Sequence, residues 1–158
     1  MKIISTVLSL ALCLLILAGC GNTEAPNANE IANTIKTYSA ETVNWTSLDK
    51  TSFEPYFGIK DSGVSQFCGF INNSEEKFDM IAVFTYDNDE TRQTVLDGIY
   101  SLSRQMSENY RIANANEATK ITEPLIAELD NTIIVCIMDT PSKALNYIEN
   151  ELKATIIS

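Results

Sequence analysis

Histidine is absent from this chain of 158 residues. Its absence excludes Ser-His-Asp and Cys-His catalysis, and it excludes every metal site built on an imidazole ligand. Basic side chains are also few, because 11 lysines and arginines are set against 21 aspartates and glutamates, which gives a formal net charge of −10. Nucleic-acid binding needs a basic surface, so we expect no nucleic-acid partner.

Cysteine is scarce as well, and two of the four cysteines fall within the first twenty residues. What is present is the composition of a globular protein, with 45% hydrophobic and 20% charged residues, rather than that of a disordered or fibrous chain. The length suits a single domain, since compact domains cluster at about 100–150 residues.

The first residues have the pattern of a signal peptide. Met1-Lys2 supplies a short positive region, and the chain is then mainly apolar from Ile3 to Ala18. A helix of these sixteen residues would reach about 24 Å, which is short of the bilayer's hydrocarbon core of about 30 Å. The run therefore predicts a cleaved signal rather than a permanent membrane span.

The apolar run ends in Leu17-Ala18-Gly19-Cys20, which resembles the bacterial lipobox: a branched apolar residue, two small residues and an obligatory cysteine. Small side chains let a peptidase approach the backbone, and only a thiol can form a thioether to diacylglycerol. We therefore predict cleavage between Gly19 and Cys20 and a diacylglyceryl anchor on Cys20, acylated with fatty acids such as palmitate. Two acyl chains give stable anchoring where one would be marginal. The alternatives are an uncleaved anchor and an ordinary secretory signal that happens to end in cysteine.

Three regions follow from this interpretation. Residues 1–19 form the lipoprotein signal peptide, residues 20–29 a flexible tether, and residues 30–158 a single α+β domain. The tether is small and polar without an apolar period, and it would span on the order of 30 Å at most. The expected location is the extracytoplasmic face of the cell membrane.

Hydrophobic spacing within the domain predicts the order α-β-β-α-β-β-α. Helices are expected over about 28–41, 87–110 and 140–152, with a further short helix over 117–121, and strands over 64–71, 78–86, 125–129 and 132–138. The strands form two hairpins, so about four mainly antiparallel strands pack against two to three helices on one side of the sheet. In the strand over 78–86, apolar residues occur at both even and odd positions, which is typical of a central strand buried on both faces.

The stretch between the first helix and the first strand is irregular. Pro55, Gly58 and Gly63 interrupt it, so we expect a loop with at most one helical turn near 51–57. Its aromatic residues are expected to cover an edge of the core, and an exposed binding patch is the alternative.

Four features occur in this order: Phe57-Gly58-Ile59, a strand hairpin, a long helix carrying Arg104 and Tyr110, and a last hairpin and helix. This combination resembles the bacterial lipoproteins that carry domain of unknown function 4358. These are found mostly in Gram-positive species, and the resemblance spans about residues 30–153. Family members often have a glutamate where this chain has Asp79. The resemblance implies a fold and a location, and it leaves function open because the family has no assigned activity.

Cys68 and Cys136 lie in apolar strand contexts. Free cysteine packs as a small hydrophobe, so burial in the core is the favoured interpretation. A disulfide is the alternative, and it requires neighbouring strands in matched register. A catalytic thiol is disfavoured because no histidine or adjacent base is present to lower its pKa.

Other motifs match known chemistry only in part. Ser-x-x-Lys spacing occurs at 47–50 and 74–77, but without the companion motifs of serine acyl-enzymes. Asp87, Asp89 and Glu90 supply carboxylates of the kind that bind calcium, although helix capping uses them more simply.

We therefore expect no catalytic, cofactor-binding or metal-binding residues. The expected function is that of a lipid-anchored extracytoplasmic protein, a non-catalytic binding or accessory module of the cell envelope. Its expected partners are the membrane, through the anchor on Cys20, and an unknown envelope protein or ligand. The alternative is a small envelope hydrolase using carboxylates or a cysteine.

Overall fold

The structure is a computed structural model and describes residues 26–39, 44–60 and 63–158. The predicted signal peptide, its cleavage site and the lipidated Cys20 lie outside these residues. The helices are α2 (Ala28–Lys36), η1 (Lys50–Ser52), η2 (Phe53–Phe57), α3 (Asp89–Tyr110), α4 (Ala115–Thr122), α5 (Ser142–Asn146) and η3 (Tyr147–Glu151). The strands are β1 (Thr46–Leu48), β2 (Val64–Asn73), β3 (Phe78–Tyr86), β4 (Leu125–Leu129), β5 (Thr132–Ile137) and β6 (Thr155–Ile156).

All strands belong to one antiparallel sheet in the order β1-β2-β3-β5-β4-β6. The two predicted hairpins, β2–β3 and β4–β5, are confirmed, and so is the α+β class. The sheet has six strands rather than about four, because β1 and β6 extend it at its two edges. These edge strands are three and two residues long, too short for an alternating pattern to be visible in a sequence.

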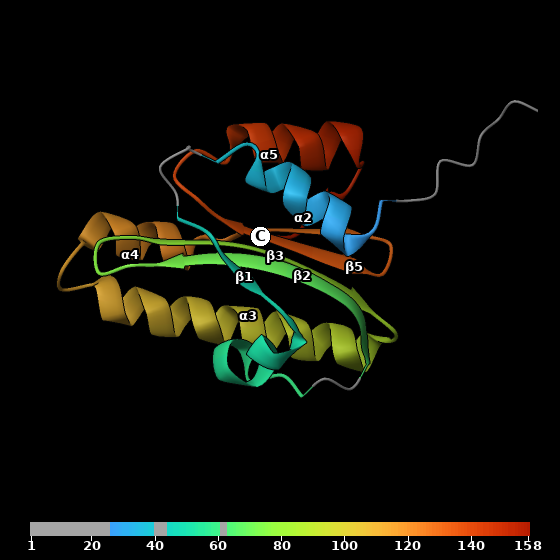
Figure 1. Ribbon diagram of the computed structural model, residues 1–158, viewed down its shortest axis with the longest axis horizontal. Helices are drawn as coiled ribbons and strands as arrows, with labels where there is room; N and C mark the ends of the chain where they lie inside the picture. Colours follow the sequence, from blue (N-terminus) through green and yellow to red (C-terminus); the bar gives the residue numbers. More distant parts are fainter. Residues whose placement is uncertain (1–25, 40–43, 61–62) are drawn as a thin grey trace, which may run out of the picture.

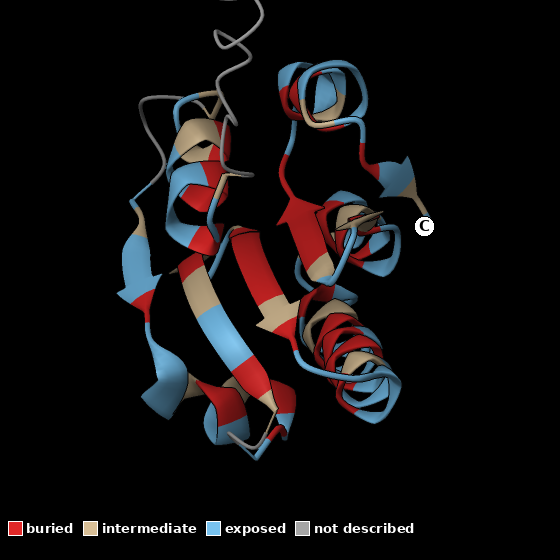
Figure 2. Ribbon diagram, turned by 90° about the vertical axis from the view of Figure 1, so that its right-hand side faces the viewer, coloured by how far each residue is buried: buried red, intermediate tan, exposed pale blue. Residues whose placement is uncertain are grey.

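Helices cover both faces of the sheet, which corrects the expectation of helices on one side. Figure 1 shows α2 and α5 on one side and α3 on the other. The reason lies in β3, which has no exposed residue and only one that is part-buried. Its alternate side chains enter two separate cores, with Met80 and Phe84 facing α3 and Ile81 and Val83 facing α2. Figure 2 shows β3 as an almost continuous buried band at the middle of the sheet.

The boundaries of the first and the last helix differ from the predicted ones. Helix α2 begins with a capping box, in which Asn27 accepts a hydrogen bond from the Glu30 backbone N–H, but it ends at Lys36 rather than near residue 41. The last helix begins at Ser142 and is divided into α5 and the π-helical turn η3. Thr140, the predicted cap, therefore lies before the helix and does not cap it.

The irregular stretch after β1 folds as the two short helical turns η1 and η2. Phe53 and Phe57 of η2 are buried, and both rings contact Phe67 of β2 and Phe84 of β3. The prediction that these aromatic residues cover the core is confirmed. Gly58 ends η2 with a φ of 66°, a left-handed conformation that glycine adopts without steric cost.

Gly98 provides a test of how closely η2 packs on α3. A Cβ at this position would lie 2.5 Å from the Phe57 carbonyl oxygen and 3.1 Å from the Ile59 side chain. Alanine is the better helix former by about 1 kcal/mol, yet we expect Gly98→Ala to destabilise the protein by about 1–3 kcal/mol because the backbone of η2 must move. Denaturant unfolding measures the change. The matched control is Ser101→Ala on the exposed side of α3, and a stabilising Gly98→Ala would contradict the packing.

Candidate functional site

A cluster of charged side chains, buried in part, joins β3, α4 and the end of β5 at one end of the sheet. We call it the Lys120 cluster, and its members are Asn72, Lys77, Asp79, Glu117, Lys120 and Asp139. Asp79 is near the start of β3 and pairs in register with Asn72 of β2. Glu117 and Lys120 are one turn apart on α4, and Asp139 follows the end of β5.

Lys120 is the centre of this cluster. Its Nζ lies 2.5 Å from Glu117 Oε1, 3.0 Å from Asp79 Oδ1 and 3.1 Å from Asp139 Oδ1. An ammonium group has three N–H donors, so each can serve one carboxylate. The carboxylates have further donors: the Asn72 amide donates to Asp79 at 3.1 Å and the Phe78 backbone N–H donates to Glu117 at 2.7 Å.

The electrostatics of the cluster favour the charged forms of Lys120 and Asp139. Burial alone lowers the pKa of Lys120, but the hydrogen bonds to Glu117 and Asp79 outweigh it and the pKa is raised. Burial likewise opposes ionisation of Asp139, yet Lys77 and Lys120 together hold its pKa below the ordinary value. A lysine whose protonated form is favoured in this way is a poor general base. The arrangement acts as an ionic bridge between α4, β3 and the end of β5.

A cavity beside the cluster is too small for a substrate. Lys77, Asp79 and Asp139 line it together with Trp45 and Met138, and its volume is about 20 Å³. A cavity needs about 10–15 Å³ to hold one water molecule. The space next to the carboxylates therefore suits a single water.

Lys120→Met tests the bridge. Asp79 and Glu117 are almost fully buried, and losing their shared cation would leave two buried carboxylates without a counter-charge. We expect a loss of about 3–5 kcal/mol in the free energy of unfolding, measured by urea denaturation. Lys143→Met on exposed α5 is the matched control. A loss as small as that of the control would show that the bridge carries no stability.

A second ion pair holds the start of α3 against β4. Arg92 binds the Glu128 carboxylate through two hydrogen bonds of 2.6 and 2.8 Å, and the Tyr86 hydroxyl donates to the same carboxylate at 2.5 Å. Burial and the Glu128 charge raise the pKa of Tyr86 to about 12. The hydrogen bond from Arg92 is the main cause of the lowered pKa of Glu128. These contacts therefore hold α3 against β4, and both oxygens of the Glu128 carboxylate already accept hydrogen bonds.

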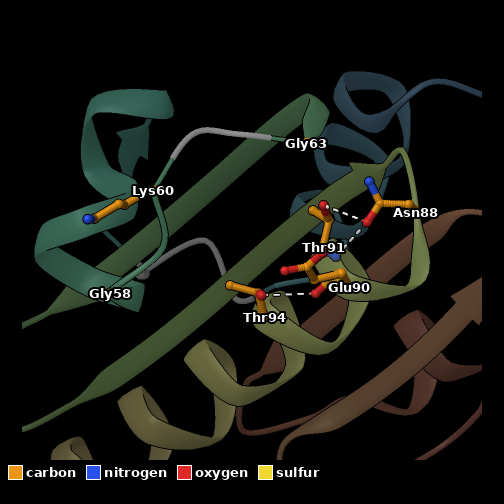
Figure 3. A pocket seen from close by; sticks show the side chains of 7 residues that line it. All are labelled: Gly58, Lys60, Gly63, Asn88, Glu90, Thr91 and Thr94. Carbon is orange, nitrogen blue, oxygen red and sulfur yellow. Dashed lines mark hydrogen bonds between the residues drawn. The ribbon is translucent and has the colours of Figure 1, made fainter.

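A polar pocket of about 450 Å³ lies at the start of α3. Its lining residues are Gly58, Lys60, Gly63, Asn88, Glu90, Thr91 and Thr94 (Figure 3). Figure 3 shows Lys60 on the side opposite Asn88. The volume falls in the range of small-molecule sites, about 300–1,000 Å³, although the walls are polar.

Asn88, Glu90 and Thr91 of this pocket also start the helix, as the capping interpretation of the acidic segment expects. The N-cap is Asn88, whose Oδ1 accepts hydrogen bonds from the Thr91 backbone N–H at 2.9 Å and from its hydroxyl at 3.2 Å. Asp89 and Glu90 occupy the first turn, where carboxylates favour the helix dipole. Within the part of the chain that the structure describes, no three carboxylate or thiol side chains are grouped to hold a metal ion.

Cys68 and Cys136 are free thiols separated by a strand. Cys68 of β2 pairs with Val83 of β3, whereas Cys136 of β5 pairs with Ile81 on the opposite edge of β3. Two strand spacings amount to about 10 Å, beyond the limit of about 7 Å between the Cα atoms of a disulfide. Core packing, the favoured interpretation, is confirmed for Cys136, and burial raises the pKa of its thiol to about 12.

Alkylation distinguishes a packed thiol from a nucleophile. A pKa of about 12 leaves about one thiolate in 10⁵ for Cys136 at pH 7. We therefore expect iodoacetamide to leave Cys136 unmodified in the folded protein and to modify it after unfolding in guanidinium, as read by peptide mass spectrometry. Part-exposed Cys68 is the internal control and should react first. Rapid modification of folded Cys136 would support a cysteine-dependent enzyme instead.

Both Ser-x-x-Lys spacings prove to be structural. Ser47 is on the edge strand β1, while the Lys50 ammonium donates to the Val64 carbonyl. Ser74 closes the β2–β3 turn by accepting from the Lys77 N–H and donating to the Lys77 carbonyl. Each of these hydrogen bonds joins a side chain to a backbone group.

A model of one protein family matches residues 38–138, and its description is "Domain of unknown function (DUF4358)". The match includes the central hairpins and every member of the Lys120 cluster except Asp139. Comparisons with curated proteins and with solved structures give no match. Among the described residues, no helix is both long enough and apolar enough to span a membrane.

Proposed function

The chain belongs to the DUF4358 family, and on that premise we propose that it is a lipid-anchored extracytoplasmic protein whose domain binds or assists another component of the cell envelope. The observation that carries the location is the sequence Leu17-Ala18-Gly19-Cys20 directly after a signal-like apolar run. A diacylglyceryl group on Cys20 is the proposed anchor. The domain would then lie close to the membrane on a short tether.

The chemistry of the buried groups supports binding over hydrolysis. A carboxylate enzyme needs an acid that can reach its substrate, whereas Asp79 and Glu117 each receive hydrogen bonds from Lys120 and from a second donor. A thiol enzyme needs an accessible thiolate, whereas Cys136 is buried with a raised pKa. The hydrolase alternative would require these groups to be released from their present contacts.

The distance available to the domain follows from the tether. Asn27, the cap of α2, comes seven positions after Cys20, and an extended chain over that interval spans about 25 Å. The proposed anchor therefore keeps the domain within reach of proteins that are themselves in or on the membrane.

Metabolic labelling tests the anchor. In bacteria supplied with radiolabelled palmitate, we expect label in the wild-type protein and none above background in Cys20→Ala, since only this cysteine would carry the lipid. Cys13→Ala removes a cysteine from the same apolar run and is the matched control that should keep its label. Protease added to cells whose outer layers are opened, while the cell membrane stays intact, should digest the wild-type domain.

Equal labelling of wild type and Cys20→Ala would reject the lipid anchor. Protection of the domain from external protease would reject the extracytoplasmic location, even where the label is present.

A further inference from the structure

A pocket of about 570 Å³ lies at the edge of the sheet beside β6. We call it the β6 pocket. Its apolar wall consists of Pro124, Leu125, Leu145 and Ile156, which come from the start of β4, from α5 and from β6. Figure 2 shows β6 at the edge next to the end of the chain, away from the central strands. The pocket is large enough for one or two side chains of a partner.

The strand beside the pocket has an open edge. β6 is the last strand of the sheet, and among the described residues it pairs only with β4. The Ile157 N–H donates to the Ile126 carbonyl, and backbone groups alternate in direction along a strand. The N–H and C=O of Ile156 therefore point away from β4, toward the outside. An edge of this kind accepts an added strand, with main-chain hydrogen bonds giving affinity and pockets selecting side chains.

The charges around the pocket are of one sign. Glu123 lies in the connection between α4 and β4, and Glu149 is on η3, so the two carboxylates flank the apolar wall. Both side chains are exposed, and neither makes an ion pair with a described residue. The described lining of the pocket contains no basic residue.

We propose that the β6 pocket binds an extended segment of a partner protein, which pairs along β6, places an apolar side chain in the pocket and brings lysine or arginine to Glu123 and Glu149. This inference specifies the partner of the proposed binding module and does not depend on the lipid anchor. Charge argues for a basic partner. A second copy of the chain would bring the same two carboxylates and a net charge of −10, and bilayer surfaces rich in anionic lipid repel such a protein.

Selection from a random peptide library tests the proposal. The full chain, attached to beads through an affinity tag and not through Cys20, is exposed to 12-residue peptides displayed on phage, with bare beads as the blank. We expect enriched peptides in which apolar residues alternate with lysine or arginine. Synthetic copies should bind in fluorescence anisotropy, and methylation of the peptide nitrogen should abolish binding at every second position, as strand pairing requires.

Paired variants locate the binding site. Glu123→Gln with Glu149→Gln should weaken peptide binding about five- to tenfold, and salt should weaken wild-type binding in the same way. Glu54→Gln with Glu75→Gln removes the same charge from exposed residues of η2 and the β2–β3 turn, and it should leave binding unchanged. Melting temperatures equal to that of the wild type show that the fold of both double variants is intact.

Three results would overturn the proposal: no enrichment over bare beads, equal weakening by both pairs of variants, or a dimer that Ile156→Lys dissociates. The last result would assign the pocket to a second copy of the chain. None of them bears on fatty-acid labelling of Cys20, so failure here and failure of the anchor are distinguishable.

Discussion

The burial of β3 on both faces is the constraint from which the rest of the architecture follows. Its nine residues form the middle of the sheet, and almost all of them are shielded from water. A strand of this kind cannot serve a sheet with one solvated face. Helices must therefore cover both sides, and the two cores contain side chains from α3 and α4 on one face and from α2 and α5 on the other.

Asp79 is the one charged residue of this buried strand, and its need for partners explains the Lys120 cluster. A carboxylate in an apolar strand is costly unless it is paired and hydrogen-bonded. Here Asn72 and Lys120 supply both requirements. The ion pair of Lys120 with Asp79 ties α4 to β3 and adds to the packing of α4 against α3.

The sequence was sufficient to predict features that repeat along the chain. The two hairpins, α3 and the central position of β3 follow from periodicity, and the start of α3 within residues 87–90 follows from the chemistry of caps. The Lys120 cluster was not predicted, because Asp79 and Lys120 are 41 residues apart and no local pattern joins them. A lone acid in a buried strand, together with Glu117 and Lys120 at helical spacing, was the available signal. The edge strands β1 and β6 were missed because pairing with a neighbour, rather than their own residues, creates them.

The position of α2 has a mechanical consequence. This helix packs on β2 and β3, and its first residue, Ala28, donates a backbone hydrogen bond to Gln66 of β2. A force pulling on the chain before Asn27 is therefore transmitted to the interior of the sheet and not to either of its short edge strands. The helix must leave an apolar core before any strand separates from its neighbour. The end of the domain that would bear tension is therefore also one of its better-buried parts.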